Sequence, residues 1–415
     1  MLTQLRVYTA LLFVTAMVLD VSADELRPKR LQSTIENVQP MTGIVLWSTN
    51  EAAATAPIQL EYAYLKYNQV AREKGKYDWK PVERLLDEIA GRKHQAILRW
   101  HDTYVGQPTG VPAFIKANPN YRETTAKSEQ KPTGFPDWSN RELQAFILEF
   151  FGRFAEKYDR DPRLAFVQVG FGLWAEYHIY DGPMKLGETF PDKDYQLVFA
   201  RHLASQFRET PWMISVDAAG GHTPFAEDAI LSALPFGLFD DSFNHQRHKQ
   251  ENEPNWFVLG IDRWKRAPTG GEFSFFKNND QKDALAPNGP HGIPFAEHAA
   301  KFHVSFIIGD DQPSFQKADV IRNAGMNCGY RFKVNRFVAS ETASELNIQN
   351  TGIAPIYFDA FPAINGVRSA TSLKGLLPGE SRLFRIAKGG TMPVVTIDCD
   401  RLTPGQRIEY IADLH

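Results

Sequence analysis

The stretch from Leu164 to Tyr177 reads LAFVQVGFGLWAEY, and it constrains the fold of this 415-residue chain more than any other segment. Its first part is a nearly continuous apolar run, which is typical of a strand buried on both faces. The run ends in a Gly-Phe-Gly turn, and a lone glutamate, Glu176, follows. Strands of this kind occur in α/β folds, and an α/β barrel keeps its chemistry at the C-terminal ends of its strands.

Short apolar runs alternate with helical patterns over the first three quarters of the chain, which indicates β/α units around a parallel sheet. The predicted strands are Gly43–Trp47, Gln59–Leu65, Gln95–Trp100, Leu164–Phe171, Met213–Val216, Gly237–Phe239, Gly270–Phe273 and Val304–Ile308. The predicted helices are Val82–Arg92, Arg141–Tyr158 (capped by Ser139), Asp194–Phe207, Ala226–Ala233 and Ala296–Lys301. Eight strands joined by crossovers predict a closed (β/α)8 TIM barrel.

The sequence pattern changes after about residue 327, where short strand-like runs alternate with turn signals such as Asn350-Thr351-Gly352. This pattern predicts a small antiparallel β-sandwich over residues 328–415, after a barrel over residues 24–327. Both cysteines, Cys328 and Cys399, fall in the second region. A disulfide and two buried thiols are equally compatible with the sequence.

Residues 1–23 resemble a secretory signal peptide. Arg6 precedes an apolar stretch from Leu11 to Leu19 that is too short to span a bilayer, and Val21-Ser22-Ala23 offers a cleavage site. An uncleaved anchor is the alternative, which Asp20 and the short run disfavour. We therefore expect an exported protein, periplasmic or extracellular, with no membrane span.

The composition excludes several classes of partner. The net charge is −3, without basic or acidic blocks, so nothing indicates binding to nucleic acid or to an anionic membrane. No Cys/His spacing resembles a zinc site, and we expect neither a metal nor a cofactor. Aromatic residues make up 12% of the chain, which suits sugar stacking as well as a large core. The sequence does not indicate whether the protein is a monomer or an oligomer.

Two glutamates follow predicted strands and lie beside glycines. Glu176 follows the fourth strand, and Glu272 ends the seventh, after Gly270 and Gly271. A surface glutamate at a strand end is common, but two at the mouth of one barrel match the pair of carboxyl groups needed to hydrolyse a glycosidic bond. We therefore predict that Glu176 and Glu272 are catalytic.

Several segments resemble retaining (β/α)8 glycoside hydrolases of the clan A type with a C-terminal β-sandwich, and a bacterial barrel-plus-sandwich family of unassigned function. They are Tyr62-Ala-Tyr-Leu-Lys-Tyr, Gly75-Lys-Tyr-Asp-Trp79, Gly172-Leu-Trp-Ala-Glu176, Gly271-Glu272, Gly329-Tyr-Arg-Phe332 and Asn350-Thr-Gly-Ile-Ala-Pro355. The resemblance implies that Glu176 is the acid/base, that Glu272 is the nucleophile, and that the substrate is a poly- or oligosaccharide.

One position departs from the clan A pattern, which places Asn just before the strand-4 glutamate, whereas this chain has Ala175. A non-catalytic carbohydrate-binding barrel and an inverting hydrolase that uses the same glutamates are therefore kept as alternatives.

Other side chains at strand ends are candidates for binding substrate. We predict that Arg99, Trp100 and Trp174 line the same cavity as the glutamates. The remaining candidates are Trp47, His101, His178, Asp217, Asp240 and His245. Each has a competing structural role, such as core packing for Trp47 or helix capping for the aspartates.

Overall fold

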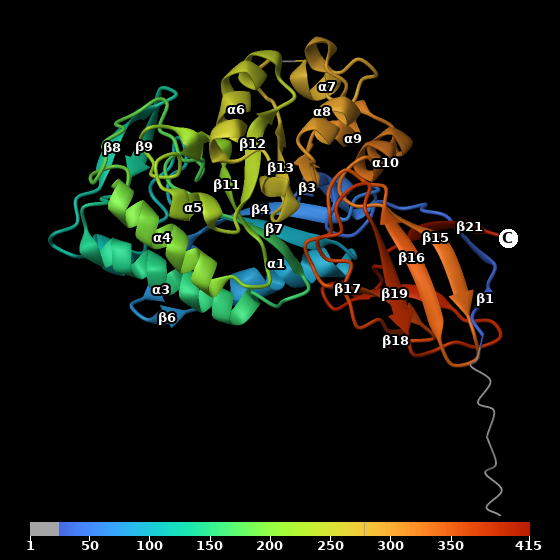
Figure 1. The fold of residues 1–415 in the computed structure, drawn as a ribbon. Helices are drawn as coiled ribbons and strands as arrows, with labels where there is room; N and C mark the ends of the chain where they lie inside the picture. Colours follow the sequence, from blue (N-terminus) through green and yellow to red (C-terminus); the bar gives the residue numbers. More distant parts are fainter. Residues whose placement is uncertain (1–24, 278) are drawn as a thin grey trace, which may run out of the picture.

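The computed structural model describes residues 25–277 and 279–415 (Figure 1), so the predicted signal peptide lies outside the described residues. Eight parallel strands close into a barrel in the order β10-β11-β12-β13-β14-β3-β4-β7. They are β3 (Gly43–Trp47), β4 (Leu60–Lys66), β7 (Gln95–His101), β10 (Leu164–Gln168), β11 (Trp212–Ser215), β12 (Gly237–Phe243), β13 (Thr269–Phe273) and β14 (Phe306–Ile308). Each predicted strand is confirmed within a few residues, and so is the (β/α)8 class.

The apolar runs form strands because both faces of the barrel sheet are buried. Along β7, Ile97 points into the barrel interior, whereas Leu98 and Trp100 join the layer beneath the helices. Side chains from other strands, such as Phe166 and Phe306, stack 5.3 Å apart inside the barrel. Burial on both faces removes the polar alternation that a half-exposed strand would show.

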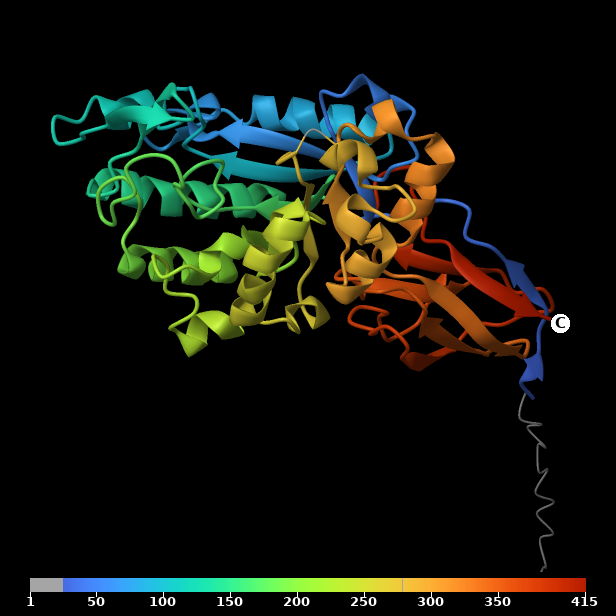
Figure 2. The ribbon, with the colours of Figure 1, turned by 90° about the horizontal axis from the view of Figure 1, so that it is seen from above.

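Helices surround the barrel (Figure 1, Figure 2). They are α1 (Lys80–Gly91), α2 (Ala113–Lys116), α3 (Arg141–Tyr158), α4 (Lys193–Gln206), α5 (Ala229–Ala233), α6 (Gln246–Leu259), α7 (Asp280–Asp283), α8 (Phe295–Lys301), α9 (Gln312–Phe315) and α10 (Ala318–Met326). Short 3-10 turns are η1 (Glu51–Ala54), η2 (Tyr67–Gln69), η3 (Val216–Ala219), η4 (Arg263–Lys265) and η5 (Pro290–Gly292).

Helix α3 begins one residue later than its predicted cap implies. Asn140, not Ser139, is the N-cap: its side-chain oxygen accepts hydrogen bonds from the backbone N–H groups of Glu142 and Leu143 at 3.0 and 3.1 Å. The Ser139 hydroxyl instead donates to Asp137 at 2.5 Å. Asn and Ser cap helices about equally well, so the sequence could not separate two adjacent candidates.

The long segment between β7 and α3 is partly ordered into strands. It contains a hairpin of β8 (Thr124–Ser128) and β9 (Lys131–Phe135), and a smaller pair, β5 (Ala71–Glu73) and β6 (Lys76–Tyr77), precedes α1.

The C-terminal region forms two sheets beside the barrel (Figure 1). The larger contains β15 (Phe332–Ala339), β16 (Ser344–Asn350), β19 (Ser381–Ile386), β21 (Tyr410–Leu414), β1 (Arg27–Pro28) and β2 (Leu31–Ser33). The smaller contains β17 (Ala360–Ile364), β18 (Val367–Arg368) and β20 (Val395–Cys399). All pairs are antiparallel except β15 with β21. Residues 27–33, which the sequence placed with the barrel, belong to this sheet instead. Cys328 and Cys399 are buried free thiols.

The C-terminal region closes the end of the barrel where the strands begin. Phe358 packs 6.1 Å from the interior ring of Phe166. Arg401 donates hydrogen bonds to the carbonyl of Leu164, at the start of β10, and to the hydroxyl of Thr210, just before β11. The opposite end, where the strands finish, is therefore the open mouth. Among residues 25–277 and 279–415, no helix has the length and apolar character to cross a bilayer.

Candidate active site

A buried arginine stands at the centre of the barrel mouth. Arg99, on β7, is 1% exposed, and its guanidinium reaches the carboxylates of Glu176 at 3.0 Å and Asp241 at 2.8 Å. The ring of Phe239 lies beneath it, 4.3 Å from the guanidinium carbon. A buried charge needs both counter-charges and hydrogen bonds, and these contacts supply them.

The arginine is oriented by polar groups from the neighbouring strands. Its Nε donates to Oε1 of Gln168 at 2.7 Å, and the Tyr62 hydroxyl donates to the same oxygen at 3.0 Å. One terminal nitrogen also donates to the Tyr64 hydroxyl at 3.2 Å. Because these partners come from β4 and β10 on either side of β7, the position of the guanidinium is set by the barrel itself.

Glu176 is presented by a tightly coiled loop after β10. Trp174, Ala175 and Tyr177 all have left-handed backbone conformations, with φ of 52°, 62° and 61°. Such conformations cost energy in residues other than glycine and concentrate at functional sites. Gly170 allows the coil to close, because a Cβ there would lie 2.0 Å from the carbonyl oxygen of Ala175. Ala175, which stands where the clan A pattern has Asn, thus lies within this buried turn.

The environment of Glu176 favours a protonated carboxyl group. Burial raises its pKa well above the ordinary value, and the negative charge of Asp241 adds to the rise, whereas Arg99 opposes it. The carboxyl groups of Glu176 and Asp241 are also within hydrogen-bonding reach of each other. Two carboxylates at such short range do not both ionise easily, so this arrangement favours the protonated form of Glu176.

Glu272 lies at the end of β13 in the same electrostatic neighbourhood. Burial raises its pKa to about 8, the charge of Asp241 contributes to the rise, and Arg99 again opposes it. Among the described residues, Glu272 has no hydrogen bond or ion pair with another side chain. Asp241 therefore perturbs both predicted catalytic glutamates.

We expect Asp241→Asn to lower the pKa of both Glu272 and Glu176, because it removes a negative charge that disfavours their ionised forms. In the native chain, a folded Glu272 that titrates near pH 8 keeps a proton that the unfolded chain loses near pH 4.3, so stability falls as the pH rises between these values. The substitution should make the decrease of stability with rising pH less steep. Urea unfolding between pH 4.5 and 8.5 measures it.

The exposed Asp262, whose side chain is 73% accessible, offers the matched control. Asp262→Asn removes the same charge far from Arg99 and should leave the pH dependence as it is. An equally steep decline in both variants would contradict the role given to Asp241.

A histidine and a second aspartate extend the polar cluster towards solvent. His178 Nε2 lies 3.4 Å from Oε2 of Glu176, and His178 Nδ1 lies 2.7 Å from Oδ2 of Asp217. Both side chains are about one quarter accessible. Asp217 thus fixes the imidazole ring against Glu176, so the structure places two of the candidate binding residues, His178 and Asp217, in contact at the mouth.

An arc of aromatic rings borders one side of the mouth. Trp47 meets Tyr64 edge-on at 4.8 Å, Tyr64 lies 6.1 Å from Tyr104, and Tyr104 lies 6.2 Å from Trp174. Trp174 is stacked at 6.1 Å on Tyr180, whose side chain is exposed. Partly exposed rings beside carboxyl groups provide the apolar faces on which sugar rings stack.

The β8–β9 hairpin supports the end of this arc. At its tip, Glu129 accepts a hydrogen bond from the Tyr180 hydroxyl, and the backbone N–H of Glu129 donates to Asp181 at 2.5 Å. The long segment between β7 and α3 therefore contacts the loop that presents Glu176.

Two predicted site residues lie elsewhere. Trp100 is fully buried and points outward, where it packs 4.7 Å from Phe150 of α3. Asp240 also points outward, where Asn252 donates to it at 2.7 Å. The predictions that these side chains face the mouth are wrong, because adjacent residues of a strand point to opposite faces and Arg99 and Asp241 occupy the inner ones.

The two remaining histidines are both buried. His101 lies beside the mouth, 5.1 Å from the ring of Tyr64, and burial together with the charges of Lys66 and Arg99 lowers its pKa to about 3. These surroundings therefore favour its neutral form at ordinary pH. His245 packs 5.2 Å from Phe276 and lies 3.8 Å from Asp280, between the loops that follow β12 and β13.

Sequence reasoning missed Asp241 as a site residue, although strand alternation could have found it. Phe239 fills the barrel interior, so the side chain two residues later must also face inward. In the described part of the chain, no group of three or more His, Cys, Asp or Glu side chains is placed to hold a metal ion.

Comparisons with known proteins come from structure alone. No protein-family model matches the sequence, and no curated protein matches it. Solved structures that are similar include an endoglucanase from an uncultured bacterium (13% identity, 69% of this chain and 84% of that chain, TM-score 0.39). A xylanase from Clostridium acetobutylicum is also similar, with 11% identity, coverage of 86% of this chain and 97% of that chain, and a TM-score of 0.40. An α-galactosidase from Thermus thermophilus has 11% identity, coverage of 75% of this chain and 66% of that chain, and a TM-score of 0.40.

Proposed function

We propose that this chain is an exported glycoside hydrolase that cleaves O-glycosidic bonds of a poly- or oligosaccharide with retention of configuration. In this proposal, Glu176 is the general acid/base and Glu272 is the nucleophile. The observation that carries the proposal is a carboxyl group in the loop after β10, held by Arg99 at 3.0 Å, with a second glutamate near the end of β13 in the same electrostatic environment.

The chemistry requires the two glutamates to differ in protonation. Glu272, once ionised, attacks the anomeric carbon, while Glu176 transfers its proton to the leaving oxygen. A covalent glycosyl-enzyme forms, and Glu176 then takes a proton from the attacking water. Arg99 lies 3.0 Å from Glu176, so it stabilises the carboxylate that the first step creates. Hydrogen bonding between Glu176 and Asp241 keeps the acid form available for the next turnover.

The surroundings of the carboxyl groups support a carbohydrate substrate. The aromatic arc from Trp47 to Tyr180 supplies stacking faces, and His178 with Asp217 offers a donor and an acceptor for sugar hydroxyls. His178 also stands in the region where the missing Asn side chain would act, since it lies 3.4 Å from Glu176.

We expect the purified protein to hydrolyse at least one member of a polysaccharide panel. NMR spectra recorded during the reaction should show the retained anomer as the first product. Glu176→Ala should slow natural substrates by roughly 10²–10⁴-fold, because it removes proton donation. The same variant should largely spare substrates with good leaving groups, such as nitrophenyl glycosides.

Other outcomes would decide between the alternatives. Initial release of the inverted anomer would assign an inverting hydrolase with the same residues. Binding of an oligosaccharide without turnover of any panel member would identify a carbohydrate-binding barrel.

A further inference from the structure

A second cavity lies at the closed end of the barrel, where it meets the C-terminal sheets. It has a volume of about 430 Å³, and residues just before β4 and β7, among them Gln59 and His94, line it together with segment 405–409. This volume falls within the range of small-molecule sites, roughly 300–1,000 Å³. Because β4 and β7 begin here and end at the barrel mouth, the cavity lies on the face opposite the proposed active site.

The lining is strongly basic. Arg92, Lys93, His94, Arg322 and Arg407 face the cavity, whereas Glu409 is the one carboxylate in its lining. Within the described part of the chain, Lys93 and Arg322 form no ion pair. These two exposed cations therefore lie at the cavity without counter-charges, and they give the cavity a positive electrostatic potential.

Buried carboxylates hold three of the basic groups in place. Glu61 is fully buried and binds Arg92 through Nε at 2.7 Å and His94 through Nδ1 at 2.7 Å. Glu409, with a side chain 7% accessible, binds Arg407 at 2.9 Å. Burying a carboxylate costs free energy of desolvation, so stability alone does not explain why Glu61 and Glu409 are buried here. Their effect is to orient the basic side chains that line the cavity.

Lys93 reaches the cavity through a strained backbone. It follows the C-cap of α1, where glycine is preferred, and it adopts a left-handed conformation with φ of 67°. Its side chain lies over Gly405, where an added Cβ would be 3.1 Å from Lys93 Cδ. A lysine in this position costs backbone energy that glycine would avoid, which points to a use for its ammonium group.

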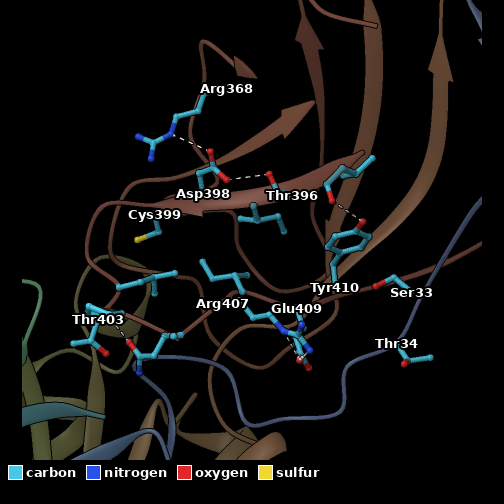
Figure 3. A pocket seen from close by; sticks show the side chains of 17 residues that line it. Ser33, Thr34, Arg368, Thr396, Asp398, Cys399, Thr403, Arg407, Glu409 and Tyr410 are labelled. Carbon is cyan, nitrogen blue, oxygen red and sulfur yellow. Dashed lines mark hydrogen bonds and ion pairs between the residues drawn. The ribbon is translucent and has the colours of Figure 1, made fainter. Parts of the chain in front are cut away.

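A larger cavity lies between the C-terminal sheets and shares one wall with the first. That cavity has a volume of about 680 Å³ and shares Gly405, Gln406, Arg407 and Glu409 with the first. Figure 3 shows Arg407 and Glu409 paired along its wall, with Arg368 and Asp398 paired opposite them. Here the charged groups are matched in pairs, so this part suits neutral hydroxyl groups.

We propose that the basic cavity binds an acidic carbohydrate, with a uronate carboxylate near Lys93 and Arg322 and its neutral hydroxyl groups along the wall of residues 405–407 and 409 that it shares with the larger cavity. Binding on this face would tether the protein to an acidic polysaccharide while the barrel mouth stays open. The proposal does not depend on the proposed hydrolysis, because it concerns residues at the other end of the barrel.

The test is calorimetric titration of the mature chain with digalacturonate, its dimethyl ester and inorganic phosphate. We expect the acid to bind, the uncharged ester to bind at least tenfold more weakly, and the affinity for the acid to fall as salt increases. Equal binding of acid and ester would overturn the proposal. Phosphate binding as tightly as digalacturonate would also overturn it, since it would show an oxyanion site without sugar recognition.

Two variants locate the binding. Lys93→Gly should raise the melting temperature, because glycine accepts the left-handed backbone, and should still weaken binding at least tenfold. Arg322→Gln should weaken binding to a similar extent. Arg84→Gln, an exposed position on α1 outside the cavity, is the matched control and should bind normally. A stabilised Lys93→Gly chain with unchanged affinity would exclude this cavity.

Discussion

Replacing Glu272 by glutamine should abolish turnover, with a loss in kcat of roughly four orders of magnitude or more. The amide keeps the size of the side chain but cannot attack the anomeric carbon. Asp241 is not free to replace it, because Arg99 holds its carboxylate at 2.8 and 3.1 Å. Single-turnover assays on a substrate found in the polysaccharide panel measure the effect.

The same variant should remain folded and should bind substrate. Its melting temperature is expected to equal or exceed that of the native chain at pH 8, since glutamine removes a carboxyl group whose ionisation is disfavoured by burial. In Glu272→Ala, whose shorter side chain leaves room at this position, azide or formate can act as an external nucleophile and should restore part of the activity on activated substrates. Full activity in Glu272→Gln would remove this residue from the reaction.

Arg99→Met should lower the free energy of unfolding by about 3–5 kcal/mol at pH 7, the usual cost of removing one partner from a buried ion pair. Methionine occupies similar space but leaves the carboxyl groups of Glu176 and Asp241 facing each other without a cation. Urea denaturation followed by tryptophan fluorescence measures the change.

The loss should shrink at acidic pH, because burial favours the protonated form of Glu176, which needs no counter-charge. Adding Asp241→Asn to Arg99→Met should recover part of the stability, because it removes one of the unpaired charges. Arg84→Gln at an exposed position should change stability by less than about 0.5 kcal/mol. A deficit in Arg99→Met that is the same at every pH would indicate lost packing rather than lost charge pairing.

The architecture was accessible from the sequence because burial leaves a strong local record. The strand from Leu164 onward is apolar on both faces, and the same pattern recurs in the other barrel strands. Glycines beside Glu176 and Glu272 were also informative, since close backbone contacts exclude a Cβ there: at Gly271 it would lie 2.0 Å from the carbonyl oxygen of Asp240.

The inward or outward direction of individual side chains was harder to predict, although a local rule governs it. Arg99 and Trp100 are adjacent on β7, so both could not line one cavity, and Asp240 and Asp241 are related in the same way on β12. Which member of each pair faces inward depends on how the barrel closes. That closure is set by pairing between strands far apart in the sequence, such as β3 with β14.

The sequence by itself determined that the chain forms eight β/α units and presents two glutamates at their ends, because strand periodicity and glycine positions are local properties. Only the tertiary structure decided that Arg99 joins Glu176 to Asp241 and that residues 27–33 pair with the C-terminal sheet. Only the folded chain, too, sets the pKa of Glu272, since burial and the charges of Asp241 and Arg99 come from different strands. Such long-range contacts leave no pattern in the residues that surround each position.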